Sequence, residues 1–129
     1  MRNPGSIDLA QLFAALADPT RLRLLNLMNG REVCVCYFVE ILKQPQPKIS
    51  RHLAYMRNAG IVTARREGKW MHYSITRLKD ETATAILNAA LEGLAGLKEM
   101  RADAASLSRA CCQPQRFHLS SAPVPCEAS

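Results

Sequence analysis

The chain has 129 residues, and 48% of them are hydrophobic, which is enough for one modest core but not for a second. Its 17 basic and 11 acidic residues give a formal net charge of +6, which favours an anionic partner. No stretch approaches the roughly 20 apolar residues of a membrane span, and residues 1–6 lack the apolar run of a secretory signal, so the sequence predicts a cytoplasmic protein without a membrane partner.

The first half of the chain shows the apolar period of helices. Asp18 followed by Pro19 is a strong helix start, and Ser6 is the expected N-cap of the helix before it. Asn29-Gly30 and Gly60 are typical helix ends. Four helices are therefore expected, over roughly residues 7–16, 18–29, 35–42 and 47–59.

After residue 60 the apolar period becomes that of strands. Residues 61–64 and 70–75 are strand-like, and the charged segment 65–69 lies between them, which predicts a β-hairpin with a charged tip. Thr76 is then expected to cap one long last helix. The apolar face of that helix consists of Ala83, Ile86, Leu87, Ala90, Leu91, Leu94 and Leu97.

The helical pattern dissolves from about Leu107, and the prolines beyond it predict an irregular tail. The expected organisation is one unit over residues 1–106 and a cysteine-containing tail over residues 107–129. The order of elements is that of a winged helix-turn-helix, a mainly α fold with a small β-hairpin. In that fold the third helix supports the fourth, which enters the DNA major groove, and the hairpin is the wing.

The fourth helix and the hairpin carry the candidate DNA contacts. Amide, hydroxyl, imidazole and cationic side chains donate to base edges and phosphates, and a helix N-terminus also favours a phosphate. A solvated polar face is the alternative, and His52 could instead pack between helices. The candidates are Gln46, Lys48, Ser50, Arg51 and His52 in the helix, and Arg65, Arg66 and Lys69 in the hairpin.

Four segments of the chain match a known pattern in their order. They are Asp18–Leu22 at the second helix, Pro47–Leu53 and Met56–Val62 at the fourth helix and its turn, and Arg65–Tyr73 in the hairpin. Together they resemble the ArsR/SmtB family of metal- and metalloid-responsive repressors, over roughly residues 7–100. The resemblance implies a repressor that binds double-stranded operator DNA. Where that family usually has a small polar helix cap, this chain has Pro45, which cannot supply a capping oxygen.

The apolar face of the last helix, together with the first helix, predicts a homodimer. The alternative is that this face belongs to the core of a single chain. A twofold dimer predicts a nearly palindromic operator with half-sites about one DNA turn apart.

The five cysteines are Cys34, Cys36, Cys111, Cys112 and Cys126. Their number is odd, two are adjacent, and two are separated by one residue, which argues against a structural disulfide framework. In a reducing cytosol, clustered thiols more often bind metals or undergo redox chemistry.

The pair Cys34 and Cys36 resembles the third-helix thiolate motif of arsenic- and cadmium-responsive members of the family. That resemblance implies trivalent arsenic or antimony, As(III) or Sb(III), as the inducer, with Cd(II) or Pb(II) as alternatives, because thiolates suit soft ions. The start of a helix also lowers the pKa of a thiol. The family's third ligand on this helix falls at Val39 and is therefore absent.

Cys111 and Cys112 are expected either to supply the missing ligand, to form a separate site, or to be incidental. For Cys126, a ligand role and an incidental one are both open. Residues two apart in a regular helix lie about 200° apart around its axis. This spacing predicts that a shared ion unwinds the start of the third helix and so weakens DNA binding.

Three other functions are alternatives to this one. The nearest is a repressor of the same fold that responds to thiol oxidation, and another is a DNA-binding protein without a sensor. An enzyme is not expected, because the chain has no glycine-rich phosphate loop and no Ser/His/Asp grouping placed for catalysis. A zinc site of the family's type on the last helix is disfavoured, because Asp80 and Glu81 are present there but no histidine lies between Ser74 and Phe117.

Overall fold

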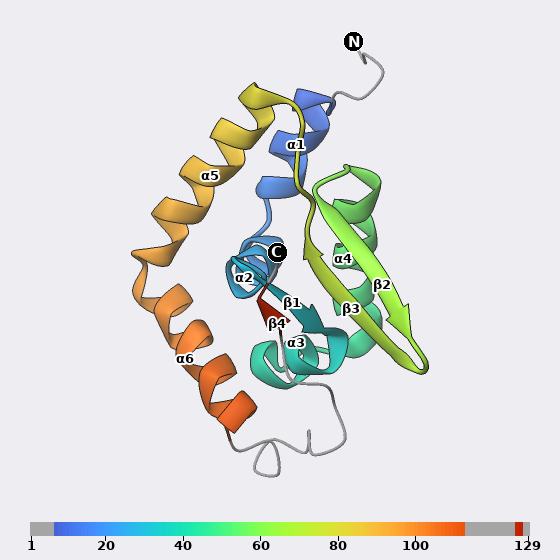
Figure 1. The fold of residues 1–129 in the computed structure, drawn as a ribbon. Helices are drawn as coiled ribbons and strands as arrows, with labels where there is room; N and C mark the ends of the chain where they lie inside the picture. The colour runs from blue at the N-terminus through green and yellow to red at the C-terminus, as the bar shows by residue number, and fades with distance from the viewer. Residues whose placement is uncertain (1–6, 113–125, 128–129) are drawn as a thin grey trace.

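The computed structural model describes residues 7–112 and 126–127, which form six helices and four strands (Figure 1). The helices are α1 (Leu9–Leu16), α2 (Pro19–Leu27), α3 (Val35–Leu42), α4 (Gln46–Asn58), α5 (Glu81–Ala95) and α6 (Lys98–Cys112). The strands are β1 (Arg31–Cys34), β2 (Val62–Glu67), β3 (Trp70–Ile75) and β4 (Cys126–Glu127). The predicted winged helix-turn-helix is confirmed, since α3 and α4 are followed by the hairpin of β2 and β3.

The first two helices both begin at aspartate caps. The Asp8 carboxylate accepts hydrogen bonds from two backbone N–H groups of the first turn, so Asp8 caps α1. The cap expected at Ser6 lies outside the described residues. The Asp18 carboxylate accepts from the N–H of Arg21 at 3.0 Å, and Pro19 takes the first helical position, as predicted.

A small antiparallel sheet has the strand order β2-β3-β1-β4. The predicted hairpin is present, but β2 continues to Glu67, so the loop is Gly68-Lys69 alone and not residues 65–69. Gly68 has a φ of 59°, a conformation that a residue without a side chain adopts easily. The charged residues at positions 65 and 66 therefore lie in a paired strand.

The strand β1 is not visible in the sequence pattern, because four residues show too little alternation. It pairs with β3 through Val33 opposite Tyr73 and Cys34 opposite His72. This pairing connects the segment before α3 directly to the wing.

The helix α4 starts without a side-chain cap. Pro45 is the N-cap residue, and its carbonyl accepts from the N–H groups of Lys48 and Ile49, both at 3.1 Å. Pro47 lies in the first turn, where a missing N–H costs no hydrogen bond. Gly60, with a φ of 84°, makes the turn into β2.

The prediction of one long last helix is wrong, because α5 and α6 are separate helices divided at Gly96 and Leu97. The cap of α5 is Asp80, whose carboxylate accepts from two backbone N–H groups of the first turn. Thr76 does not cap it, because the Thr76 hydroxyl is hydrogen-bonded to the Thr63 hydroxyl in the hairpin.

The helix α6 continues to Cys112 and does not end near Leu107, where the sequence pattern dissolves. The predicted irregular tail concerns mainly residues 113–125, which lie outside the described residues. The division of the chain after residue 106 therefore stays a prediction.

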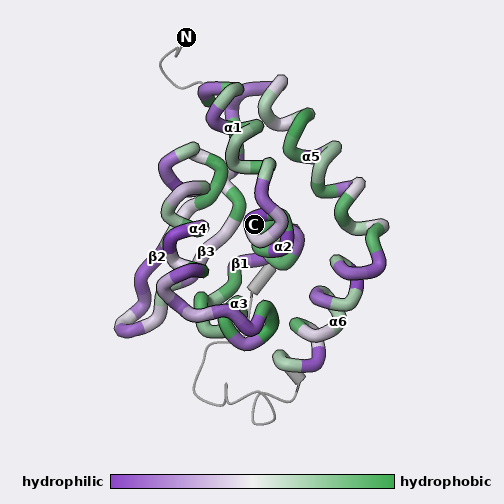
Figure 2. Tube along the Cα trace, turned by 180° about the vertical axis from the view of Figure 1, so that it is seen from behind, coloured by the Kyte–Doolittle hydropathy of each residue, from purple (hydrophilic) through white to green (hydrophobic). Residues whose placement is uncertain are grey.

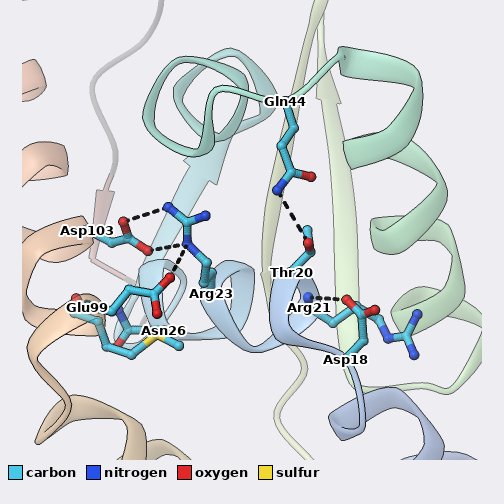
Figure 3. A network of polar contacts seen from close by, with 9 residues as sticks. Asp18, Thr20, Arg21, Arg23, Asn26, Gln44, Glu99 and Asp103 are labelled. Atoms are coloured by element: carbon cyan, nitrogen blue, oxygen red, sulfur yellow. Dashed lines mark hydrogen bonds and ion pairs between the residues drawn. The ribbon is translucent and has the colours of Figure 1, made fainter.

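The helices α5 and α6 form an arm along one side of the molecule, opposite α4 and the hairpin (Figure 1). The arm is held by α2, against which α6 packs (Figure 3). Arg23 donates two hydrogen bonds to the buried Asp103, at 2.8 and 2.9 Å, and Asn26 donates to the Met100 carbonyl at 2.9 Å. These contacts fix α6 on α2, and α6 also packs against α3.

The core lies between the helices and the sheet, and α3 is largely hydrophobic, whereas β2 is hydrophilic (Figure 2). Much of the apolar face predicted for the last helix is buried within this single chain. Its buried members are Ala83, Leu87, Leu91 and Leu94. None of the helices in the described part of the chain has the length and hydropathy to cross a membrane.

Candidate functional site

The helix α4 presents its polar side to solvent. Three predicted DNA contacts, Gln46, Lys48 and Arg51, are exposed, and Ser50 is partly exposed. The opposite side is anchored in the core by Ile49, Leu53 and Met56. The helix therefore displays donors for bases and phosphates on a rigidly held face.

His52 turns toward α2 and not toward solvent. Its Nδ1 lies 3.3 Å from Nη1 of Arg21 and 3.8 Å from a carboxylate oxygen of Asp18. Burial lowers the pKa of His52 below its usual value, so the ring is mostly neutral near pH 7. The structure thus places this predicted DNA contact at a packing position between helices.

Arg21 joins three helices. Its guanidinium donates to the carbonyls of Ala14 and Ala15 at the end of α1, at 3.0 and 2.9 Å. The same group lies 4.3 Å from the centre of the Tyr55 ring on α4. Sequence reasoning did not assign Arg21 a role, although it lies in the segment that resembles the family.

All three wing cations, Arg65, Arg66 and Lys69, are exposed, and Arg65 is in addition engaged by carboxylates. Its Nε and Nη2 donate to the two oxygens of Glu32, at 3.1 and 2.6 Å, and its Nη1 lies 3.6 Å from Glu67. The hydrogen bond from Arg65 holds the pKa of Glu32 below its usual value. The structure therefore ties one wing cation to β1.

The two cysteines of the motif lie at the junction of β1 and α3. Cys34 is the N-cap of α3 with an extended backbone, φ −72° and ψ 142°, and Cys36 lies in the first turn. Their Sγ atoms are 3.1 Å apart. The prediction that the helix must unwind to bring them together is wrong, because Cys34 lies outside the helix and the 200° spacing does not apply.

The two thiols differ in acidity. The hydrogen bond from the Cys36 thiol lowers the pKa of Cys34 to about 6, although burial opposes ionisation. The N–H groups at the start of α3 lower it further. The same contact, together with burial, raises the pKa of Cys36 above its ordinary 9.0. Near pH 7 the pair therefore holds one thiolate and one thiol.

The end of α6 brings a third thiol near Tyr37, the residue that follows Cys36. Cys111 is half-buried against the core, where α6 packs on α3. The neighbouring Tyr37 is fully buried, and its hydroxyl has no hydrogen-bond partner among the described residues. Burial, with the nearby sulfurs of Cys111, Cys36 and Cys34, raises the pKa of Tyr37 to about 12, so the hydroxyl remains a donor.

The remaining cysteines are described less fully. Cys112 ends α6, and its side chain lies outside the described residues. Cys126 lies in β4, whose backbone pairs with β1 so that Cys126 is opposite Glu32. Within the described side chains, no three from His, Cys, Asp and Glu come close enough together to hold one metal ion.

Sequence reasoning missed Glu32, Tyr37 and His72 at this site. Glu32 and Tyr37 adjoin the cysteine motif, which was the only signal available for them. His72 is buried, and only the register between β1 and β3 places it beside Cys34. Their partners come from distant segments, which a local pattern does not identify.

A recognition helix supported by α3, with a charged wing beside it, defines a winged-helix DNA-binding regulator of transcription. The family model "Bacterial regulatory protein, arsR family" matches residues 18–64, from α2 into β2. The chain belongs to the ArsR/SmtB family of transcriptional regulators, and it is not an enzyme.

Two curated relatives show the extent of the similarity. The HTH-type transcriptional regulator MJ1325 of Methanocaldococcus jannaschii is 52% identical over 68 residues, which cover 51% of this chain and 75% of that protein. The arsenical resistance operon repressor of Escherichia coli is 49% identical over 67 residues, which cover 51% of this chain and 57% of the repressor. The chain thus matches little more than half the length of the latter.

The fold is also similar to solved structures. The transcriptional repressor BigR from Xylella fastidiosa superposes with a TM-score of 0.53 at 31% identity, covering 63% of this chain and 80% of BigR. A cadmium resistance regulator homolog from Staphylococcus aureus and a probable mercury resistance operon repressor from Streptomyces lividans also match in sequence. The relatives therefore include regulators named for resistance to arsenicals, cadmium and mercury.

Proposed function

We propose that the chain is a transcriptional repressor that leaves its operator DNA when trivalent arsenic or antimony binds its cysteine thiols. The observation that carries this proposal is the 3.1 Å separation of the Cys34 and Cys36 sulfurs beside the helix that supports α4. One of the two is a thiolate near neutral pH, so a soft, thiol-seeking ion meets a nucleophilic sulfur already in place.

The binding chemistry is an exchange of oxygen for sulfur at arsenic. Arsenous acid loses two hydroxyl groups as water while two As–S bonds form. The Cys36 thiol supplies one of the two protons, and solvent supplies the other, because the Cys34 sulfur is already a thiolate. A third thiol, from Cys111 or Cys112 on α6, replaces the last hydroxyl and releases a third water. Because Cys111 is not yet within reach of the same ion, this last step draws the end of α6 toward α3.

The proposed DNA contacts lie on α4 and the wing. In this proposal Gln46, Lys48, Ser50 and Arg51 enter the major groove, and Arg66 and Lys69 contact the neighbouring phosphates; their exposure supports it. Arg65 joins them once it is released from Glu32, and His52 acts by holding α4 against α2. Two such faces in a homodimer fit a nearly palindromic operator.

The test uses the purified, reduced full chain and a DNA duplex selected by it from a random-sequence library. Arsenite is titrated into the complex, and DNA binding is followed by fluorescence anisotropy. We expect release at near-stoichiometric arsenite. Cys34→Ser and Cys36→Ser should each abolish the release while retaining DNA binding, and Cys111→Ser or Cys112→Ser should weaken it.

Cys126→Ser, outside the proposed ligand set, is the matched control and should behave like the wild type. The proposal fails if arsenite-loaded protein holds the duplex as tightly as ligand-free protein. The alternative inducers are separated by the same assay, because release by cadmium, lead or peroxide but not by arsenite would identify a different signal for the same fold.

A further inference from the structure

A row of side chains crosses the sheet from the cysteine pair to the wing. Cys34 on β1 lies opposite His72 on β3, and His72 lies opposite Arg65 on β2. Residues directly opposite each other in antiparallel strands place their side chains on the same face of the sheet. The three side chains therefore form one continuous row from the sensor motif to a wing cation.

Two carboxylates are attached to this row. Glu32 precedes Cys34 by two residues on β1, so it shares the same face. His72 is only 5% exposed, with its Nδ1 3.9 Å from Glu32 and its Nε2 3.4 Å from Glu67. The buried imidazole thus lies between the two carboxylates that flank Arg65.

Arg65 offers the same edge to Glu32 that it would offer to DNA. The planar Nε and Nη2 edge of a guanidinium matches either a carboxylate or a phosphate, and here both atoms donate to Glu32. A phosphate must displace Glu32 to gain this contact. The side chain of Arg65 is 50% exposed, so the exchange needs no opening of the core.

We propose that Glu32 competes with a DNA phosphate for Arg65, and that an ion bound at Cys34 favours the Glu32 contact. The second part of this inference, the effect of an ion bound at Cys34, rests on the proposed function. An ion that bonds the Cys34 sulfur fixes the end of β1, and Glu32 lies on that same short strand. The sensor thereby holds a wing cation away from DNA, and by linkage DNA weakens ion binding by the same factor.

The first test is DNA binding by the ion-free full chain carrying Glu32→Gln. Freeing Arg65 should tighten binding and steepen the salt dependence of log K by about one unit, as expected for one additional phosphate contact. In an Arg65→Gln background, Glu32→Gln should have no effect on either quantity. Glu40→Gln on α3 makes the same charge change where the described residues show no ion pair, and it should change neither.

The competition is overturned if Glu32→Gln leaves the affinity and the salt slope unchanged, or if its effect persists without Arg65. A merely structural role of Glu32 would not change the salt slope in this way. The second test measures the ratio of DNA affinities without and with saturating arsenite, which for Glu32→Gln should fall by about fivefold or more relative to wild type.

Arsenite binding itself, followed by the ultraviolet absorbance of arsenic–thiolate bonds, should keep its wild-type stoichiometry in Glu32→Gln. An unchanged affinity ratio in that variant would overturn the link from Cys34 to the wing while leaving the proposed function intact. A wild-type chain that binds DNA but ignores arsenite would overturn both the proposed function and the link. In that case the ion-free test still decides whether Glu32 competes for Arg65.

Discussion

The Cys34 sulfur lies where a strand ends and a helix begins, and this position determines its chemistry. The extended backbone of an N-cap residue turns the side chain back over the first helical turn, where it meets the Cys36 thiol at 3.1 Å. Thiolate charge is stabilised there by a donor and by the helix N-terminus. A cysteine one residue further along would lie inside the helix and lose this convergence.

The ionisation of Cys34 gives a direct test of this account. We expect the ultraviolet thiolate absorbance of the reduced chain to include a step near pH 6, because the pKa of Cys34 is about 6. The folded state binds fewer protons than the unfolded state between this pKa and the ordinary 9.0. The free energy of unfolding should therefore rise with pH across that window, and below about pH 6 this thiol should contribute no further change.

Variants assign that step. Cys34→Ser should remove it, and Cys36→Ala, which deletes the hydrogen-bond donor, should move it toward higher pH. A step near pH 6 that survives Cys34→Ser would contradict the assignment.

Lys43 is the other residue whose local geometry makes a prediction. It ends α3 in the left-handed region, with φ 54° and ψ 46°, where a side chain is disfavoured and glycine is not. We expect Lys43→Gly to raise the free energy of unfolding by about 0.5–1 kcal/mol, measured by urea denaturation. Lys43→Ala keeps the unfavourable geometry and is the control, so a Gly variant no more stable than the Ala variant would refute the argument.

Among the elements, α6 is held on α2 by a buried ion pair. The side chain of Asp103 is 9% exposed and receives two hydrogen bonds from Arg23, whose side chain is 21% exposed. Removing one partner from such a pair leaves a buried charge without compensation, which costs more than the intact pair contributes. The contact therefore determines how α6, and Cys111 with it, lies on α2 and α3.

We expect Arg23→Met to lower the free energy of unfolding by about 2–4 kcal/mol, somewhat less than for a fully buried pair because Arg23 is partly exposed. The double variant Arg23→Met with Asp103→Leu should recover most of this loss, since no buried charge is then left unpaired; Glu99, the other partner of Arg23, is exposed to solvent. Arg101→Met, at an exposed position of α6, is the control and should have little effect in the same urea denaturation experiment. Equal losses in the single and double variants would show that packing, and not the ion pair, holds α6.

The elements that carry local signals could be predicted from the sequence, and those that depend on distant partners could not. Asp18-Pro19 and Gly60 fix helix ends through their own backbone chemistry, and both predictions hold. Thr76 and Asp80 could each cap a helix that follows them. Asp80 caps α5, because the Thr76 hydroxyl is already hydrogen-bonded to Thr63 in the hairpin. The same holds for the thiol site. The local motif identifies its cysteines, but its polar neighbours are known only from the pairing of β1 with β3.

At the scale of the whole molecule, the described residues expose apolar side chains on α1 that suit contact with a second copy of the chain. Of the apolar face predicted for the last helix, the members Ala83, Leu87, Leu91 and Leu94 are buried in their own core, whereas Leu97 is exposed. On α1, by contrast, Leu9 is 41% and Phe13 55% exposed. Such a pair of large apolar side chains on one helix suits a twofold contact, in which the same surface is used by both subunits.

We therefore expect the wild-type chain to sediment as a dimer and Phe13→Glu to sediment as a monomer, because the variant places a charge in the centre of the apolar contact. The monomer should keep its helical circular dichroism, since Phe13 is not part of the core, but it should bind a two-half-site duplex far more weakly. Ala105→Glu adds the same charge at an exposed position of α6 and should leave both properties unchanged. A dimer that persists in Phe13→Glu would show that the interface does not lie on α1. A monomeric wild type would mean that each recognition helix reads its half-site alone.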